Sequence, residues 1–226
     1  MWVNYHITTL HLMLRAGLLR VFFMNLTILA ASGRTGLALT RQALQRGHTV
    51  TAIARDPSQI TVDDSPNLRK AVGDAHDPAT ITAAIDPDST VLSALGADRA
   101  GILLAGAQAV VAARPRRIIW LGAYGTGKSA LVAGETTGLI EKLLGADTLA
   151  DKTGADDTVL AAGGTIFHAG LLSEGPESPS RRTVGLQDGP PFDLATKVTR
   201  ETVAAAMLDE AETARFPGTV ALPLMG

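Results

Sequence analysis

The sequence predicts an α/β protein in which helices cover both faces of a doubly wound parallel sheet, with a small lobe near the C-terminal end. Short apolar runs alternate with helix-like segments along most of the 226 residues. The runs are apolar throughout, which is typical of strands that are buried on both faces. Because 46% of the residues are hydrophobic, the chain can bury a sizeable core and is not expected to be disordered.

The first elements form a strand, a helix and a second strand. Residues 25–31 are a short apolar run without a helical period, as expected of a buried strand. Residues 35–46 repeat their apolar side chains at helical spacing and stop at Gly47, so they are expected to be a helix. Residues 48–54 are rich in β-branched side chains and predict the second strand, after which Pro57 turns the chain.

The same alternation continues to the end of the chain. Further strands are expected at 68–72, 90–95, 117–121, 165–168, 182–186 and 219–222. Further helices are expected at 78–85, 100–113, 151–162 and 199–212, the last with Thr199 as its N-cap. After Leu171 the chain becomes rich in Pro, Ser and Glu and loses its periodicity, so it is expected to form the loops of the C-terminal lobe.

Composition and charge exclude several classes of function. Twenty Lys and Arg against 22 Asp and Glu leave a net charge of −2, which is not the basic surface of a general nucleic-acid binder. The absence of cysteine removes disulfides, thiolate nucleophiles and thiolate metal sites. The histidines do not show the spacing of metal ligands, so no metal site is expected.

The N-terminal segment, 1–23, does not fit the alternation. Its apolar stretch is interrupted by Arg15 and Arg20 and is shorter than the roughly 20 apolar residues that span a bilayer. It also lacks a clear signal-peptide cleavage site. An amphipathic helix on a membrane surface is one interpretation. We favour an extension outside the core, with the folded domain at 24–226.

A glycine-containing turn joins the first strand to the first helix, where residues 30–36 read Ala-Ala-Ser-Gly-Arg-Thr-Gly. Glycine here lets the backbone approach a pyrophosphate, and the N–H groups at the helix start hold the anion. The preceding strand and following helix are the context that a dinucleotide-binding turn requires. A plain βα turn that uses glycine only for its geometry is the alternative.

This turn resembles the Gly-Ala-Thr-Gly-x-Thr-Gly motif of the atypical short-chain dehydrogenase/reductases. Within them, the chain is most similar to the NAD(P)H-binding branch of biliverdin-IXβ/flavin reductases and NmrA-like proteins. The resemblance extends over about 25–222 and implies a single Rossmann-like, NAD(P)-binding domain whose C-terminal lobe holds the substrate. Its other matching segments are 47–56, 73–74, 91–96, 151–152 and 160–166.

The end of the second strand indicates the form of the cofactor. An acidic residue there would bind a free ribose 2′-OH, whereas Arg55 suits a 2′-phosphate, with Arg34 assisting from the loop. The resemblance also implies NADPH, with NADH less favoured, although a solvated Arg55 in a turn is the plain alternative. Ala30 replaces the first glycine of the motif and is expected to crowd the turn. The cofactor is also expected to contact Ser32, Gly33, Thr35, Gly36, Asp74, Ala75, Ala94, Leu95, Gly96 and Lys152.

Residues 122–129, Gly-Ala-Tyr-Gly-Thr-Gly-Lys-Ser, also match the P-loop pattern, with Lys128 on phosphates and Ser129 on Mg²⁺. The loop follows the fifth strand, however, and no apolar strand ending in a suitable Asp comes after it. A P-loop NTPase therefore remains a minor alternative. Tyr124 and Lys128 also have the spacing of the reductase Tyr/Lys pair, but the glycines between them disfavour the helix that this pair needs.

Three residues are candidates for catalysis. By resemblance, Thr148 and Lys152 occupy the Tyr/Lys positions of the family, so Lys152 would hold the nicotinamide ribose. Tyr124 is expected to line the substrate pocket. His168 ends the sixth strand at the edge that faces the crevice, either as an acid or substrate contact or as a structural residue bonded to the backbone. No Ser–His–Asp arrangement is suggested.

The sequence therefore predicts an NADPH-dependent reductase of a small carbonyl, quinone or flavin-like acceptor. One alternative is a non-catalytic NADP-binding redox sensor of the NmrA-like kind, which the missing family Tyr and Ser would suit. Another is a cofactor-binding scaffold for a non-redox isomerisation or cyclisation. We expect a cytoplasmic monomer or homodimer that binds a small-molecule substrate, with no nucleic-acid partner and no stable membrane insertion.

Overall fold

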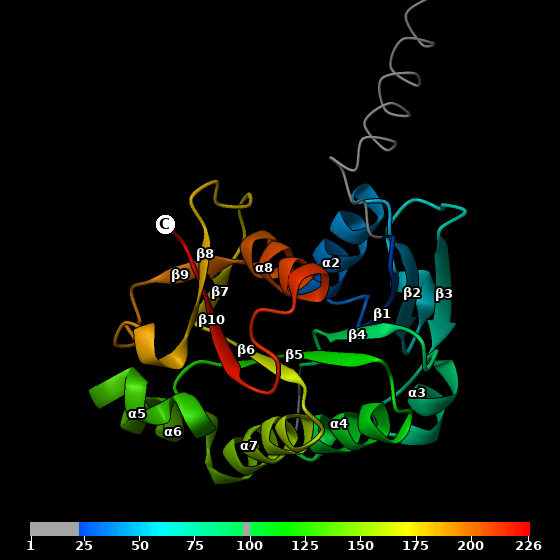
Figure 1. Cartoon of the computed structure of the whole chain (residues 1–226). Coiled ribbons are helices and arrows are strands. Elements are labelled where there is room, and N and C mark those ends of the chain that lie inside the picture. Colours follow the sequence, from blue (N-terminus) through cyan, green and yellow to red (C-terminus); the bar gives the residue numbers. More distant parts are fainter. Residues whose placement is uncertain (1–22, 97–99) are drawn as a thin grey trace, which may run out of the picture.

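The computed structural model describes residues 23–96 and 100–226 (Figure 1). Apart from Phe23, the predicted N-terminal extension lies outside the described residues. No helix within these two ranges combines the length and the apolar character that crossing a bilayer requires. The predicted architecture is confirmed, because helices lie on both faces of a mostly parallel sheet (Figure 1).

An eight-stranded sheet in the order β3-β2-β1-β4-β5-β6-β10-β8 forms the centre of the protein. Its strands are β1 (Asn25–Leu29), β2 (Thr49–Ala54), β3 (Leu68–Val72), β4 (Thr90–Ser93), β5 (Arg117–Ala123), β6 (Thr165–Ala169), β8 (Arg182–Gly185) and β10 (Val220–Leu224). Every neighbouring pair is parallel except β10 with β8. The order reverses between β1 and β4, which creates the switch point where such sheets bind ligands.

Five helices form the layers on the two faces of the sheet. One face is covered by α2 (Arg34–Gln45) and α8 (Arg200–Thr213), which pack on each other (Figure 1). The opposite face is covered by α3 (Pro78–Ala84), α4 (Ile102–Ala112) and α7 (Ala146–Ala161). Each layer buries one apolar cluster against the strands.

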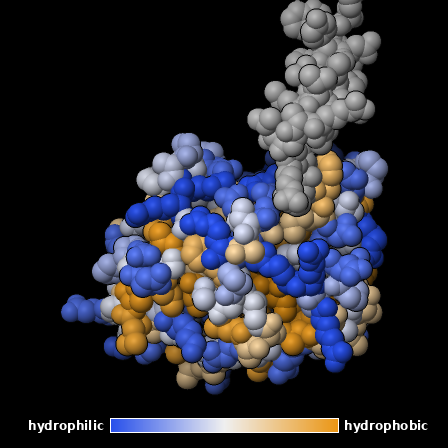
Figure 2. Space-filling model, in the orientation of Figure 1, coloured by the Kyte–Doolittle hydropathy of each residue, from blue (hydrophilic) through white to orange (hydrophobic). Residues whose placement is uncertain are grey.

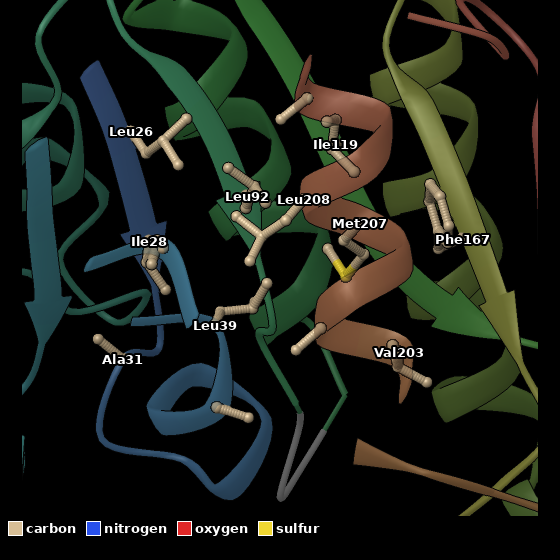
Figure 3. Close-up of a cluster of buried hydrophobic side chains, with 14 of the residues drawn as sticks. Leu26, Ile28, Ala31, Leu39, Leu92, Ile119, Phe167, Val203, Met207 and Leu208 are labelled. Atoms are coloured by element: carbon tan, nitrogen blue, oxygen red, sulfur yellow. The ribbon is translucent and has the colours of Figure 1, made fainter. Parts of the chain in front are cut away.

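The cluster beneath α2 and α8 contains fully buried side chains from both helices and from the central strands (Figure 3). Its large members include Leu26, Ile28, Leu39, Leu92, Ile119, Phe167, Met207 and Leu208. On the other face, Trp120 of β5 is the largest buried side chain and packs with residues of α4 and α7. The central strands are buried on both faces, as their continuous apolar runs indicated, whereas the edge strands β3 and β8 are partly exposed.

Several elements differ from the prediction. The helix expected at 151–162 begins at Ala146, where Asp147 in its first turn favours the helix N-terminus. Two short strands, β7 (Leu171–Ser173) and β9 (Lys197–Thr199), form a separate parallel pair that was not predicted. Three residues are too few to show a strand period, so no pattern could have found them.

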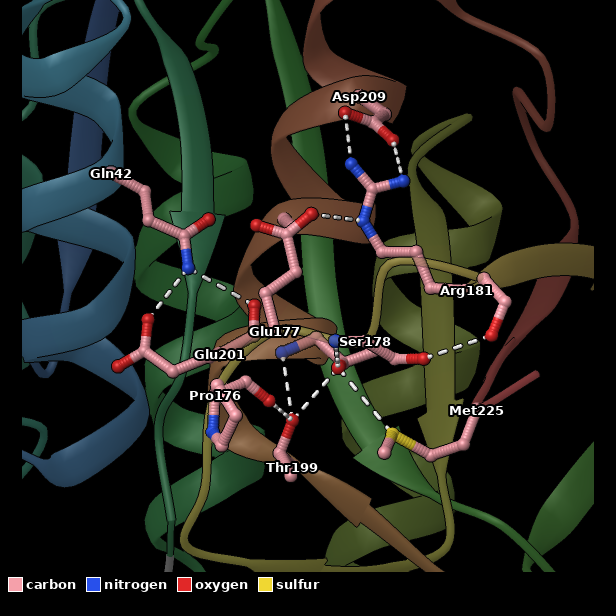
Figure 4. A network of polar contacts seen from close by, with 12 residues as sticks. Gln42, Pro176, Glu177, Ser178, Arg181, Thr199, Glu201, Asp209 and Met225 are labelled. Carbon is pink, nitrogen blue, oxygen red and sulfur yellow. Dashed lines mark hydrogen bonds and ion pairs between the residues drawn. The ribbon is translucent and has the colours of Figure 1, made fainter.

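The C-terminal lobe is tied to the start of α8. Thr199 caps this helix as predicted, because its Oγ1 accepts a hydrogen bond from the Thr202 N–H at 3.2 Å. The same hydroxyl donates to the Pro176 carbonyl at 2.9 Å, which fixes the loop after β7 (Figure 4). Further along this loop, Arg181 pairs with Asp209 of α8 at 2.9 Å.

The segment between β5 and α7 folds into two short helices, α5 (Ala130–Ala133) and α6 (Thr137–Leu144). Apolar residues gather on the surface over these helices (Figure 2). Leu131, Leu139 and Leu143 have exposed side chains there. The two helices lie beside the lobe, and Thr136 donates a hydrogen bond to the Phe192 carbonyl at 2.8 Å.

Candidate functional site

The carboxyl ends of the central strands border a cleft of about 500 Å³ at the switch point of the sheet. The cleft is lined by the ends of β1, β2, β5 and β6, by the loops after β1 to β4, and by residues of the flanking helices and β7. All predicted cofactor residues except Gly36 line it: Ala30, Ser32, Gly33, Arg34, Thr35, Arg55, Asp74, Ala75, Ala94, Leu95, Gly96 and Lys152. The structure thus brings together residues from five separate parts of the chain.

The turn between β1 and α2 lines the cleft. A Cβ on Gly36 would lie 2.7 Å from the Cα of Ala31, and one on Gly33 would lie 3.3 Å from the Ala30 oxygen. Glycine at both positions therefore keeps the helix close to the strand and leaves the backbone bare. The first turn of α2 contains no acidic residue and its N-cap has no side-chain hydrogen bond, so the helix end can receive an anion.

Ala30 adopts a left-handed conformation, with φ of 61°. This is the position where the resembled motif has glycine. The predicted crowding thus takes the form of backbone strain, because a Cβ disfavours this region of conformational space.

Charged residues lie at the end of the cleft that follows β2 and β3. Arg55 is exposed and borders the cleft beside Asp74 and His76. Asp74 accepts hydrogen bonds from the His76 N–H at 3.0 Å and from His76 Nδ1 at 2.8 Å. These two bonds lower the pKa of Asp74, so its carboxylate stays ionised and holds the turn after β3.

Lys152 reaches the cleft from α7, next to a buried carboxylate that the sequence did not reveal. Asp151 accepts hydrogen bonds from the N–H groups of Leu103 at 3.1 Å and Leu104 at 2.9 Å. It therefore caps α4 from a separate helix, since the N-cap residue Gly101 has no side chain. These two hydrogen bonds fix α7, and with it Lys152, against the start of α4.

A second, smaller pocket of about 260 Å³ meets the cleft at Gly170. Tyr124 and Phe192 line it with their rings edge to face at 5.3 Å. The Tyr124 hydroxyl donates to the Pro190 carbonyl. Burial raises the pKa of Tyr124, so the phenol keeps its proton at neutral pH. The remaining lining is mainly apolar: Pro190, Pro191, Val198, Pro223, Leu224 and Met225, with Asp193, Thr196 and Lys197 adding polar groups.

His168 also borders the second pocket, but both of its ring nitrogens are engaged. Its Nδ1 lies 2.6 Å from Ser129 Oγ and its Nε2 lies 2.9 Å from Asp156 Oδ2. The expectation that His168 bonds to the backbone is wrong, because its partners are side chains. The expectation of no Ser–His–Asp arrangement is wrong as well. Ser129 is fully buried, however, so it cannot attack a substrate.

Gly122 at the end of β5 makes room for this buried group. A Cβ at this position would lie 2.7 Å from His168 Cδ2 and 3.1 Å from Asp156 Oδ1. The glycine at 122 and the histidine at 168 are therefore matched across the neighbouring strands β5 and β6.

Comparison with known proteins agrees with this geometry. The model of a family described as NAD(P)H-binding matches residues 30–214, which include the turn at 30–36, the cleft and α8. The chain belongs to this NAD(P)H-binding family. This agrees with its resemblance to the atypical short-chain dehydrogenase/reductases.

Solved structures of other NAD(P)H-binding and related proteins share the fold of this chain. A short-chain dehydrogenase/reductase from Veillonella parvula in complex with NADP is 21% identical, with a TM-score of 0.69 over 90% of this chain and 95% of that one. The anaerobilin reductase ChuY from Escherichia coli is 21% identical, with a TM-score of 0.71 over 88% and 96%. The oxidoreductase ylbE from Lactococcus lactis is 18% identical, with a TM-score of 0.73 over 90% and 91%.

The P-loop alternative does not fit this NAD(P)H-binding chain. The hydroxyl of Ser129 is buried and donates to the Thr126 carbonyl at 3.0 Å, so it cannot bind Mg²⁺. Residues Gly127–Ser129 form a 3₁₀ turn, and α5 after it has only four residues. The helix N-terminus that cradles phosphates in a P-loop is therefore missing from this loop.

Arg200 of the cleft and its partner Glu174 were not predicted. Arg200, the first residue of α8, lines the cleft. Its Nη1 donates to Glu174 Oε1 at 2.8 Å, and Arg34 Nη1 donates to the same oxygen at 3.1 Å. Arg34, expected to assist at a 2′-phosphate, is thus held by Glu174. No local motif marks Arg200 or Glu174, because they meet only through the β7–β9 pair.

Proposed function

We propose that this NAD(P)H-binding chain is an NADPH-dependent reductase of a small carbonyl, quinone or flavin-like acceptor. The observation that carries the proposal is the junction at Gly170, where the long cleft with its bare glycine turn opens into a small, mainly apolar pocket. A dinucleotide and an acceptor could lie end to end across this junction. When bound, the nicotinamide would supply hydride.

The residues of the cleft suit the parts of NADPH. The backbone of 32–36 and the start of α2 would hold the pyrophosphate. Arg55 would bind the 2′-phosphate, because a guanidinium can form two parallel bonds to phosphate oxygens. Asp74 and Ala75 would lie beside the adenine, and Ala94, Leu95 and Gly96 along the dinucleotide. Lys152 would bind the nicotinamide ribose.

The second pocket would position the acceptor and deliver its proton. Its aromatic and proline side chains suit a flat, apolar molecule. Tyr124 keeps its proton at neutral pH and can contact the acceptor. We propose that His168 contributes to proton delivery by positioning Tyr124. Its contact with Ser129 holds the loop that carries Tyr124. Solvent is the other source of the proton.

One observation favours a second candidate, an NADP-binding redox sensor that does not turn over. Both ring nitrogens of His168 and the hydroxyl of Tyr124 already have partners within the protein. A proton donor at this pocket would have to exchange one of these bonds during each turnover.

Turnover with a panel of acceptors separates the two candidates. We expect the purified protein to oxidise NADPH, followed by absorbance, with at least one quinone, flavin or carbonyl compound and to form one reduced product per NADPH. Lys152→Met should raise KM for NADPH while thermal unfolding stays close to that of the wild type. NADPH binding without oxidation by any panel member would contradict the reductase and support the sensor.

A further inference from the structure

We infer that Arg200 is a further cofactor-binding residue, which forms with Arg34 an anion site for the pyrophosphate of the dinucleotide. We also infer that Glu174 competes for this site as an internal carboxylate. The inference rests on the proposed function. It adds Arg200 as a residue that binds the pyrophosphate and Glu174 as a residue that competes with it. It concerns both NADPH and NADH, since they share the pyrophosphate.

The small β7–β9 sheet brings Glu174 and Arg200 together. The two strands pair in parallel, with Ser173 opposite Thr199. Glu174 and Arg200 directly follow the last residues of the two strands, so the pairing places both at the same end of the small sheet. The hydrogen bond from Thr199 to the Pro176 carbonyl at 2.9 Å then fixes the loop that carries Glu174 (Figure 4).

Helix packing brings the third member to the same place. Arg34 is the first residue of α2 and Arg200 is the first residue of α8. The two helices lie side by side on one face of the sheet (Figure 1). Both arginines line the cleft beside the bare turn at Gly33, so two guanidinium groups and the positive end of α2 face the same space.

Glu174 has the geometry of a stand-in for a phosphate oxygen. A single atom, Oε1, accepts bonds from both guanidinium groups, at 3.1 Å from Arg34 and 2.8 Å from Arg200. The side chains of Arg34 and Glu174 are 72% and 68% exposed, so this bridge is screened by water and weak. The side chain of Arg200 is only 16% exposed, so it is already held in place on the wall of the cleft.

The competition should therefore favour the dinucleotide. A charge-assisted bond from an arginine to a phosphate typically changes affinity by about tenfold or more. An exposed ion pair contributes about fivefold at most. Removing the Arg200 guanidinium should thus lower the affinity for the dinucleotide strongly. Removing the charge of Glu174 should raise this affinity modestly.

Isothermal titration of the full chain with NADPH, NADH and adenosine 2′-monophosphate tests this. For Arg200→Gln we expect affinity for both dinucleotides to fall by about tenfold and by the same factor, with the monophosphate unaffected. Arg200→Lys should recover part of the loss. For Glu174→Gln we expect affinity for both dinucleotides to rise by about two- to fivefold.

Arg41→Gln is the matched control, because Arg41 of α2 pairs with Glu201 of α8 outside the cleft. It should leave all three affinities unchanged. Equal affinities of Arg200→Gln and the wild type, or a loss confined to NADPH, would overturn the assignment of Arg200. Weaker dinucleotide binding by Glu174→Gln would overturn the competition. A wild-type chain that binds neither dinucleotide would instead refute the proposed function itself.

Discussion

Ala30 introduces backbone strain into the turn between β1 and α2. Its φ of 61° places an alanine in the left-handed region, at the point where the chain leaves β1 for the cleft. Such a conformation costs an L-residue about 1–2 kcal/mol, whereas glycine adopts it freely. The strain is thus stored in the turn that would receive the pyrophosphate.

Ala30→Gly is expected to stabilise the protein and to tighten cofactor binding. Relief of strain should outweigh the added freedom of the unfolded chain and raise the free energy of unfolding by roughly 0.5–1 kcal/mol, measured by urea denaturation. Removal of the methyl should also lower the Kd for NADPH. Ala214→Gly is the matched control, because Ala214 has φ of 53° at the end of α8 and does not line the cleft. It should give similar stabilisation with an unchanged Kd. The same change of Kd in both variants would contradict a role of Ala30 in the turn.

At the scale of elements, α8 is locked to the sheet by one buried carboxylate. Glu210 is 2% exposed and bonds to Arg117 of β5 at 2.9 Å and to Thr165 of β6 at 3.2 Å. It also accepts hydrogen bonds from the N–H groups of Arg215 and Phe216, which fix the turn into β10. Because α8 begins at Arg200, this lock also positions the wall of the cleft.

Glu210→Ala should lower the free energy of unfolding by about 3 kcal/mol, because it removes the carboxylate that balances the Arg117 charge and leaves Arg117 Nη2 and two N–H groups without their acceptor. Denaturant unfolding measures this loss. Glu177→Ala removes an exposed partner of Arg181 and should cost less than about 1 kcal/mol. Similar losses for the two variants would show that Glu210 does not act as the lock.

Which features the sequence predicted depends on how far apart the interacting residues lie. The turn at 30–36 and the apolar strands are local patterns, so the fold and the cleft could be predicted. Asp151 caps α4 from 48 residues away, and Glu174 meets Arg34 across 140 residues. The partners of His168 likewise come from two separate segments. A single sequence contains no signal for such pairs, because each residue alone resembles an ordinary surface or helix residue.

At the scale of the whole molecule, ion pairs join α8 to α2 and to the residues just after α2, and these pairs affect the response to acid. Burial alone would raise the pKa of Glu212, but hydrogen bonds from His48 and Arg46 outweigh it, and the pKa is lowered. A folded-state pKa below the unfolded one adds stability at higher pH, and this is lost as the pH falls. The contribution should therefore be complete above the ordinary value of about 4.5 and be lost as the pH falls below it through the lower folded-state pKa.

Unfolding by urea at a series of pH values checks this expectation. The wild type should lose stability more steeply than Glu212→Gln as the pH falls through and below about 4.5, and the two profiles should converge in acid. Parallel profiles across the whole range would show that the contacts of Glu212 do not affect the acid response.

Equilibrium titration of the wild type and Arg55→Ala with NADPH and NADH directly tests the assignment of the cleft to NADPH. The wild type should bind NADPH more tightly than NADH. Arg55→Ala should lower the affinity for NADPH by about tenfold or more, because it removes charge-assisted bonds to the 2′-phosphate. It should change the affinity for NADH by less than about twofold. Equal weakening of both cofactors, or a wild type without preference for NADPH, would contradict the account.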